Sequence, residues 1–377
     1  MSDKRAMAAD RTKPSEKPLK DGYSVLVGGM DERSWATELA QFSDANLNQT
    51  WACSSSRGGD FTTLSLRKNG EVVAAALVRI WALPLLRGGY ASVFRGPLCC
   101  RKAQEKQVEH FVQAIRALRN EFVCRRGMRL RVAPCACGDA AWDLQSILIQ
   151  EGFKALPEDV EKTIVMDLAE EPEQLIANMR NEWRRKLRTA EREQLHVVEG
   201  RSGKHFDTFL EAFREMIERK KFVERIDVNQ YRAMQEHLSE EERMHVILCY
   251  DDEVLCYGAI FSMMGECAVY LFGATTNAGL TRKGSYAAHW YAIQKMRQMG
   301  IRWYDLGGVD SEKNRGSWYF KSDLAGTRRP VVILPGTWEA KAGGAAEGFF
   351  STGQRIRRMA KQLQLKARAR LREKAVK

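Results

Sequence analysis

The spacing of apolar residues in the first half of the chain switches repeatedly between a helical period and a strand period. The segment "SWATELAQF" has helical spacing, and "TTLSLRKNGEVVAAALVRIWAL" predicts two strands joined by a hairpin turn at Asn69-Gly70. A strand "YASVFRGPL", a long helix from Lys102 to Arg125, a strand "MRLRVAP" and a helix ending at "LIQEGF" follow. This succession predicts a mixed α/β domain.

The second half repeats this order of elements. It starts with the strand "EKTIVMDL" and one long helix, "EPEQLIANMRNEWRRKLRTAEREQ", followed by the strand "HVVEG" and the helices "KHFDTFLEAFREMIERK" and "VNQYRAMQEHL". A hairpin turning at Asp251-Asp252-Glu253, the strand "CAVYLFGAT", the helix "SYAAHWYAIQKMRQMG" and the strand "RWYDLGG" complete the half. The repeat, in a chain of 377 residues, predicts two α/β domains.

Both ends of the chain differ from these domains. Residues 1–21 are charged and lack an apolar stretch, so we expect a disordered lead. The tail from Ser351 carries ten Lys or Arg against one Glu, and its spacing predicts a basic amphipathic helix with the apolar positions Ile356, Met359, Ala360, Leu363 and Ala367. The apolar face could dock on the first domain, or the basic face could meet RNA or an anionic membrane; the sequence leaves these alternatives open.

The net charge of +12 changes this picture by indicating an anionic partner: nucleic acid, an acidic lipid surface or a phosphorylated substrate. A basic protein without such a partner has the same composition. The nine cysteines lack the paired spacing of a zinc site, which predicts reduced thiols and no metal. No segment approaches the roughly twenty apolar residues that span a bilayer, so we expect a cytoplasmic protein, at the inner membrane face if the tail binds lipid.

The strongest candidate for chemistry is the stretch "WYDLGGVDSEKNRGSWYFK". Gly307 and Gly308 follow an apolar strand, where glycine permits a positive φ or the close approach of a ligand to the backbone, although a plain tight turn looks the same. Lys321 stands directly behind three aromatic residues at 318–320. We expect these rings to immobilise and partly desolvate the lysine, while the glycines leave room for a substrate.

A second candidate is the helix "MRNEWRRKLRTAERE". Its apolar residues Met179, Trp183, Leu187 and Ala190 form one stripe. The rest of the surface carries six cations, with Glu182 and Glu191 as the nearby acids, and is either a solvated basic face or a contact surface for the phosphate backbone of RNA. These cations are Arg180, Arg184, Arg185, Lys186, Arg188 and Arg192.

Other catalytic motifs do not occur in the sequence. It has no Walker loop, no GxSxG and no HExxH. The segment "LTRKGSYA" is a degenerate version of the loop that cradles pyrophosphate in CoA-dependent acetyltransferases, because Arg282 lies one residue too close to Gly284 and Tyr286 replaces a small residue. For His289, on the following helix, packing or capping is a simpler expectation than catalysis.

Taken in order, several of these motifs resemble the Fem-type aminoacyltransferases, which move an amino acid from aminoacyl-tRNA to the stem peptide of a peptidoglycan precursor. The resemblance extends from about Tyr23 to Pro335. "YASVFRGPL" is similar to the family's strand followed by a basic residue, Gly and Pro, here with Arg95 in the basic position. "LRVAP", "EGF" and "KTIVMDL" resemble its linking run, "ERKKFVER" a segment ending in the basic residue Arg225, and "YDLGGVDSEKNRGSWYFK" its most specific motif.

The resemblance implies two GNAT-like acyltransferase domains side by side, with the C-terminal helix returning to the first. The expected bounds are 22–158 plus 336–377 for the first domain and 159–335 for the second. It also implies a tRNA-dependent enzyme without a cofactor, a monomer, acting on a nucleotide- or lipid-linked peptidoglycan precursor in cross-bridge formation. The residues it assigns are Lys321 and Phe320 for catalysis, Arg225, Tyr319, Gly307, Gly308, Asp310 and Arg95 for substrate, and Arg184, Arg185, Lys186 and Arg188 for tRNA.

Two departures from the family's pattern bear on the acceptor. A lysine that the family places after a Trp-Ala pair is missing, because Cys53 follows Trp51-Ala52, and an aspartate expected before a strand-end proline is Ala133. The acceptor could therefore differ from a standard cell-wall precursor. Two other functions stay open: an acyl-CoA-dependent N-acyltransferase, and a non-catalytic protein that binds RNA or the membrane surface through its basic tail.

Overall fold

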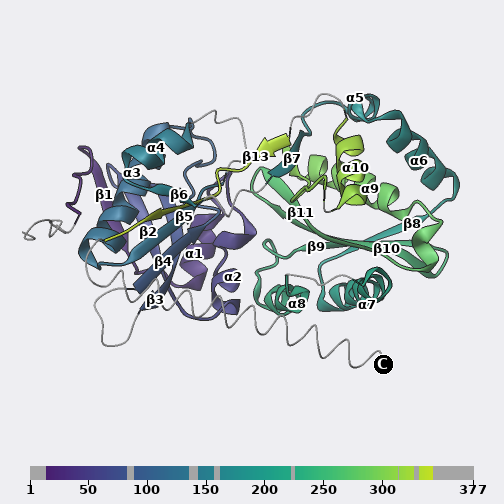
Figure 1. The fold of residues 1–377 in the computed structure, drawn as a ribbon, viewed down its shortest axis with the longest axis horizontal. Coiled ribbons are helices and arrows are strands. Elements are labelled where there is room, and N and C mark those ends of the chain that lie inside the picture. The colour runs from purple at the N-terminus through teal and green to yellow at the C-terminus, as the bar shows by residue number, and fades with distance from the viewer. Residues whose placement is uncertain are drawn as a thin grey trace, which may run out of the picture.

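The strands of the protein form two sheets that lie side by side, each covered by helices (Figure 1). The computed structural model describes residues 14–82, 89–135, 143–156, 162–221, 226–312, 314–326 and 331–342. The basic tail, which we expected to be a helix, falls outside these residues. The two hairpins expected from the sequence are present, and the turn residues Asn69, Gly70 and Asp252 all adopt the positive φ of tight turns.

The first sheet belongs mainly to the N-terminal half of the chain. Its strands, in spatial order, are β1 (Tyr23–Val27), β2 (Asp60–Lys68), β3 (Glu71–Ala82), β4 (Gly89–Phe94), β5 (Arg129–Ala133), β14 (Thr337–Ala340) and β6 (Lys154–Leu156). Neighbouring strands run antiparallel except β4 and β5, which are parallel.

The second sheet has the same design in the C-terminal half. Its spatial order is β8 (His196–Gly200), β9 (His245–Asp251), β10 (Val254–Met264), β11 (Cys267–Thr275), β12 (Trp303–Asp305), β7 (Lys162–Asp167) and β13 (Val331–Ile333). The one parallel pair is again the fourth and fifth strands, β11 and β12. The repeat of elements seen in the sequence is therefore a repeat of strand order and direction.

The sixth position of each sheet is filled by an exchanged strand. In the chain, β7 follows β6 and β14 follows β13, so a simple repeat would place each beside its predecessor. Instead, β14 pairs with β5 and β6 in the first sheet, and β7 pairs with β12 and β13 in the second. Each sheet thus holds a strand that the order of the repeat would assign to the other, and this exchange ties the two halves together.

One continuous hydrophobic core spans both halves. The helices of the first half that contribute are α1 (Glu32–Leu39) and α2 (Trp51–Ser56); those of the second half are α7 (Gly203–Lys220) and α8 (Val228–His237). Figure 1 shows α2 beside α8 at the junction. Trp35 and Phe42 are fully buried in the same cluster as Phe206 and Phe209. Burial of this much aromatic surface favours a fixed arrangement of the halves.

Separate cores lie on the other face of each sheet. In the first half this face carries α3 (Val108–Leu118), the wider π-helical turn η2 (Arg119–Arg125) and α4 (Leu144–Gln150). In the second half it carries α5 (Pro172–Asn178), α6 (Asn181–Arg192), α9 (Gly284–Gln298) and α10 (Arg315–Ala325). Short 3₁₀ turns, η1 (Leu47–Gln49) and η4 (Ala278–Leu280), complete the described elements that the site uses.

Two long helices expected from the sequence are shorter or broken. The helix expected from Lys102 starts at Val108 and changes to a π-helical turn after Leu118. The helix expected over residues 171–194 is two helices, because Met179 and Arg180 adopt extended backbone angles. The reason lies in α10: the backbone N–H of Arg180 donates to the Asp323 carbonyl at 2.9 Å, outside any helical ladder.

The expectation of a disordered lead is wrong for residues 14–20. Leu19 packs against the core of the first half. The backbone N–H of Lys17 donates to Asn120 Oδ1 at 3.1 Å, and Asn120 Nδ2 donates to the Lys17 carbonyl at 2.6 Å. The Lys17 ammonium lies 3.4 Å from Glu151. One amide side chain on η2 therefore satisfies both backbone groups of Lys17, which composition alone does not reveal.

A tight turn between β10 and β11 inserts into the first half. Gly265 has a φ of +58°, and a Cβ on it would lie 2.4 Å from the Ser43 carbonyl oxygen. The next residue, Glu266, donates its backbone N–H to that oxygen at 2.7 Å and forms an ion pair with Lys106 at 3.2 Å. Glycine is required here both by the backbone angle and by the close approach.

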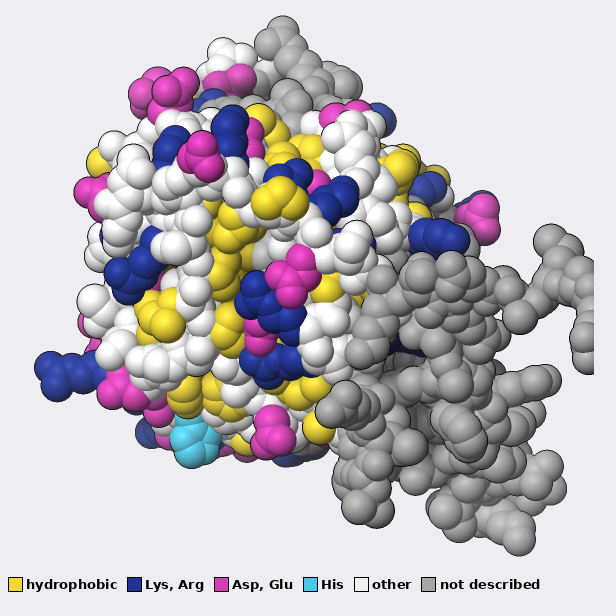
Figure 2. Space-filling view, turned by 90° about the vertical axis from the view of Figure 1, so that its left-hand side faces the viewer, with side chains coloured by type: hydrophobic (Ala, Val, Ile, Leu, Met, Phe, Trp, Pro, Cys, Tyr) yellow, Lys and Arg dark blue, Asp and Glu magenta, His cyan; other side chains and the backbone are white. Residues whose placement is uncertain are grey.

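The outer surface gives two further constraints. None of the helices in the described ranges has an apolar stretch that could cross a bilayer. Figure 2 shows the end of the first half, where Lys and Arg side chains intermingle with Asp and Glu around a band of hydrophobic side chains. The described residues of this face therefore mix both signs of charge and do not form a continuous basic surface of the kind that a phosphate backbone would need.

We predict that removing the large buried side chain of Trp338 from the exchanged strand β14 destabilises the protein. Trp338 on β14 is 4% exposed, and its Nε1–H donates to the Pro335 carbonyl at 2.8 Å. Trp338→Ala should lower the free energy of unfolding by about 3–5 kcal/mol, measured by urea denaturation. Ile333→Ala, at a side chain 61% exposed on β13, is the control and should change it by less than about 0.5 kcal/mol. Equal effects would mean that β14 adds little to the first sheet.

Candidate active site

The candidate site is built where β12 ends and α10 begins. β12 delivers Asp305, the chain passes through Gly307 and Gly308, and α10 starts after Asn314, whose side chain accepts the backbone N–H of Ser317 at 3.2 Å. This helix was not expected from the sequence. Lys321 lies in its second turn, with its side chain directed back toward the glycine pair.

Lys321 is buried, with 7% of its surface exposed. Its Nζ donates to the Gly308 carbonyl oxygen at 2.8 Å and lies 5.4 Å from the centroid of the Tyr270 ring, a cation–π arrangement. Burial lowers the pKa of Lys321 to about 8, although the charge of Asp305 opposes this shift. Among the described residues, no carboxylate forms an ion pair with it.

Gly307 keeps a gap between this ammonium and the surface. It has a φ of +71°, and a Cβ added to it would lie 2.7 Å from the Tyr270 carbonyl oxygen and 3.8 Å from Lys321 Nζ. A side chain at this position would therefore clash with β11 and stand in front of the ammonium. From the sequence we expected Gly307 to leave room for a substrate, and its position next to the Lys321 ammonium agrees with that expectation.

Asp305 organises the backbone of this turn. It is 3% exposed, receives the backbone N–H of Gly307 at 2.8 Å, and forms a short hydrogen bond with the hydroxyl of Thr163 on β7. Thr163 also lies 3.1 Å from the Gly307 carbonyl. These partners occupy the Asp305 carboxylate, so the contacts of Asp305 are those of a residue that holds the turn in place.

A crevice of about 830 Å³ lies in front of the turn, between the two halves of the molecule. Tyr270 and Gly308, which contact the Lys321 ammonium, line it together with Gly307, whereas Lys321 itself is not part of the lining. The opposite wall comes from the first half. That wall includes Asn46, Asn48, Arg57, Phe94 and Arg95, and Lys162 from β7 adds another cation.

Of the other substrate residues expected from the sequence, some line the crevice and others lie away from it. Arg95 and Asp310 line the crevice with the two glycines. Tyr319 is 61% exposed and is not part of the crevice lining. Phe320 packs into the core, with its ring 4.9 Å from His289 and 5.3 Å from Tyr286, measured between centroids. Arg225 falls outside the described residues.

The ring that flanks the Lys321 ammonium is therefore not one of its chain neighbours. On a helix, Tyr319 points almost opposite to Lys321 because successive residues are about 100° apart. The ring beside Nζ is that of Tyr270, on β11, fifty-one positions earlier in the chain. Sequence reasoning missed Tyr270, because the alternation in "CAVYLFGAT" would place it on the same face as Phe272.

The basic helix α6 presents part of its expected charge to solvent. Arg185 and Lys186 share one carboxylate, Glu182, at 3.0 and 3.1 Å. Arg184 is used locally, since it donates to the Ala177 carbonyl at 2.9 Å. Arg188 is exposed. The helix keeps a positive surface, but three of the four cations expected to contact tRNA already have partners within the protein.

The loop that resembles a pyrophosphate cradle is filled by the protein. A Cβ added to its glycine, Gly284, would lie 3.1 Å from Tyr257 Cβ and 3.3 Å from Cys249 Sγ, so this glycine lies close against β9 and β10. The backbone N–H groups of Tyr286 and Ala287 donate to the Lys283 carbonyl at 3.0 and 3.4 Å, and that of Arg282 donates to the Gly279 carbonyl at 3.2 Å. These three amides are thus engaged within the protein.

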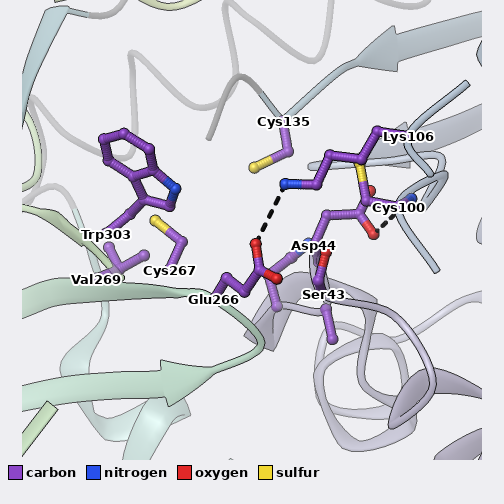
Figure 3. Close-up of a pocket in the computed structure, with 11 residues that line it drawn as sticks. Ser43, Asp44, Cys100, Lys106, Cys135, Glu266, Cys267, Val269 and Trp303 are labelled. Carbon is purple, nitrogen blue, oxygen red and sulfur yellow. Dashed lines mark hydrogen bonds and ion pairs between the residues drawn. The ribbon is translucent and has the colours of Figure 1, made fainter. Parts of the chain in front are cut away.

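A second, small cavity lies beside the inserted turn (Figure 3). Cys135 from the first half and Cys267 from the second line it, and the ion pair of Lys106 with Glu266 crosses it. Burial raises the pKa of Cys100, which also lines it, to about 12, so this thiol stays protonated. The cavity holds about 30 Å³, room for a water molecule rather than a substrate.

Comparison with known proteins supports an acyltransferase of the GNAT fold. A family model described as an acetyltransferase (GNAT) domain matches residues 177–322, which contain α6, the filled loop and Lys321. No curated protein sequence matches the chain. The match lies within the second half of the chain, and the two mixed sheets of the structure confirm the α/β class expected from the sequence.

Two solved structures share the fold of most of the chain. The crystal structure of FemX superposes with a TM-score of 0.70 at 14% identity, covering 84% of this chain and 97% of FemX. A conserved protein of unknown function from Bacteroides thetaiotaomicron gives a TM-score of 0.52 at 10% identity, covering 85% of this chain and all of that one. The fold expected from the resemblance to the Fem-type family, with two such domains side by side, is confirmed.

We predict that the buried lysine costs stability at neutral pH. Below pH 8, Lys321 is charged in both the folded and the unfolded chain, and the folded state carries the desolvation cost. Lys321→Met should therefore raise the free energy of unfolding at pH 7 by up to about 3 kcal/mol. The gain should shrink as the pH rises from about 8 toward the ordinary lysine pKa of 10.5, where the unfolded lysine also loses its proton. Denaturant titrations of both proteins across this range test it, and a gain independent of pH would contradict it.

Proposed function

We propose that this protein is an aminoacyltransferase that moves an amino acid from aminoacyl-tRNA to an amine of a peptidoglycan precursor or a related peptide acceptor. The observation that carries the proposal is the Lys321 ammonium, buried behind a glycine gap at the wall of a crevice between two GNAT-type halves. The fold shared with FemX and the order in which the motifs follow one another in the sequence also support the proposal.

The reaction requires little covalent help from the protein. The acceptor amine attacks the ester carbonyl of the aminoacyl-tRNA, a C–N bond forms, the ester C–O bond breaks, and one proton passes from the amine to the departing ribose oxygen. Holding amine and ester together removes much of the barrier. The tetrahedral intermediate carries a negative oxygen, and a fixed ammonium in a partly dry site stabilises it. In this proposal Lys321 has this role, and the contacts of its Nζ with Gly308 and Tyr270 support it.

The crevice supports an anionic acceptor. Arg57 caps the C-terminal end of α2, shortly after the position where the family's lysine is missing, and it lines the crevice with Arg95 and Lys162. Three cations on the walls would attract the phosphates of a nucleotide- or lipid-linked precursor. In this proposal Arg225, expected from the sequence to bind phosphate, remains a candidate, and the protein works without a cofactor.

An acyl-CoA-dependent N-acyltransferase is the second candidate, favoured by the match to an acetyltransferase domain. The close packing of Gly284 and the engaged amides of Arg282, Tyr286 and Ala287 speak against it, because they leave fewer groups to hold a CoA pyrophosphate at this loop. Transfer RNA would instead meet the exposed cations of α6.

We predict that charged tRNA, and not acetyl-CoA, is the donor. The purified protein is incubated with a mixture of aminoacyl-tRNAs or with acetyl-CoA, each with and without a peptidoglycan precursor, and loss of donor is measured. Only aminoacyl-tRNA should be consumed, and only with acceptor present. Lys321→Ala should lower kcat by about 10²–10³-fold, the usual effect of removing one oxyanion contact. Consumption of acetyl-CoA at a comparable rate would replace the proposal by the second candidate.

We also predict that α6 contributes to tRNA affinity. Reversing two exposed cations, Arg185→Glu with Arg188→Glu, should weaken tRNA binding and flatten the slope of log K against log salt by about two. The matched control is Lys204→Glu with Arg214→Glu on α7, which packs on the opposite face of the second sheet and carries the same change of charge. If both pairs change the slope equally, net charge and not α6 governs binding.

A further inference from the structure

His289 lies at the centre of a buried chain of hydrogen-bonded side chains beneath the candidate site. It is fully buried on α9. Its Nδ1 is 2.8 Å from the hydroxyl of Tyr304, and its Nε2 is 3.2 Å from the hydroxyl of Tyr257. The Tyr257 hydroxyl continues the chain to that of Tyr270, at 3.1 Å. Both ring nitrogens therefore have partners in a region closed to solvent.

This chain touches Lys321 from two sides. The ring of Tyr270, which lies beneath the Lys321 ammonium, meets the imidazole edge-on at 4.7 Å between centroids. The ring of Phe320, the residue before Lys321 on α10, meets the same imidazole at 4.9 Å. His289 is thus the common neighbour of the ring under the ammonium and of the helix turn that carries it.

The imidazole in this position is neutral. Burial lowers the pKa of His289 to about 3, and the positive charge of Lys321 adds to the effect. A neutral imidazole offers one N–H donor and one bare nitrogen, so it can satisfy one tyrosine as donor and the other as acceptor. The titratable groups that face the chain from the packed strands and helices are Tyr257, Tyr270, Tyr304, Asp305, Cys249 and Lys321.

We propose that His289 is a positioning residue for Lys321: by anchoring Tyr257 and Tyr304 and packing against Tyr270 and Phe320, it holds the ammonium against the Gly308 carbonyl and keeps water from it. The inference rests on the proposed function of Lys321 for its effect on turnover. Its effect on the environment of the lysine can be measured without any substrate. A histidine that only filled the core would alter stability but leave the titration of Lys321 unchanged.

The experiment follows the titration of Lys321 directly. Trace labelling with acetic anhydride from pH 6 to 11, read by mass spectrometry of the peptide that contains Lys321, gives the pH at which its amine becomes reactive. The parent should show a midpoint near 8. In His289→Phe, the Tyr304 hydroxyl loses its His289 partner and the Tyr257 hydroxyl loses one of its two, so we expect Tyr270 to loosen, water to reach the ammonium and the midpoint to rise by about one pH unit. His289→Gln, whose amide can donate and accept, should stay close to the parent.

The kcat of the same variants is the second test of the proposal. In the aminoacyl-transfer assay, His289→Phe should lower kcat about tenfold or more with KM nearly unchanged, because the interaction lost is one made in the transition state. His289→Gln should recover most of the rate. Tyr257→Phe removes only the hydroxyl shared by His289 and Tyr270, so it provides a milder variant with a smaller shift in the same direction if His289→Phe fails to fold.

The control is another buried histidine of the second half, His245 on β9. His245 is 1% exposed and its Nδ1 lies 2.6 Å from Glu199, with no contact to Lys321. His245→Gln should leave the Lys321 midpoint and kcat unchanged. A folded His289→Phe or Tyr257→Phe protein with the parent midpoint would overturn the proposal, as would equal losses of kcat in the Gln and Phe variants without a shift. A shifted midpoint in a protein that transfers no amino acid would leave the positioning role standing and remove the proposed function instead.

Discussion

The placement of one desolvated ammonium group is the constraint around which the second half of the structure is arranged. The Lys321 ammonium donates a hydrogen bond to the Gly308 carbonyl, lies over the Tyr270 ring and is attracted by the charge of Asp305. Asp305 is in turn tied to Gly307 and Thr163. Three strands and one helix must therefore keep their relative positions to within a fraction of an ångström, since a charge in a dry site is costly unless its few partners stay in place.

The exchange of β7 and β14 explains how two separate sheets can serve one crevice. β7 carries Thr163 and Lys162 into the second sheet, directly beside β12, while the strand before it in the chain, β6, belongs to the first sheet. β14 returns the chain to the first sheet. Together with the continuous core and the inserted Gly265 turn, the exchange restrains sliding of one half along the other. The crevice walls thus have a fixed separation, which a reaction between two bound substrates requires.

Much of the fold could be predicted from the sequence because it depends on local signals. The hairpins follow from Asn69-Gly70 and Asp252, and the repeat of elements follows from the apolar periods. The break between α5 and α6 could not be predicted, because it is caused by the carbonyl of Asp323, far along the chain. The ordered lead depends likewise on Asn120. Lys321 and the glycine pair were found through their motif, yet the helix α10 that joins them was missed.

The residue that sequence reasoning could least have found is Tyr270, and a single irregularity of β11 explains why. Tyr270 pairs with Phe261 while Phe272 pairs with Ile260, so Leu271 is an extra residue in the strand. In a regular strand Tyr270 and Phe272 would share a face. Here the bulge sends Phe272 to the core between the halves and Tyr270 to the core of α9 and α10. Bulges of this kind re-aim side chains next to active sites. Because the alternation of apolar residues does not record it, the ring that carries the lysine becomes visible only when the strands are paired.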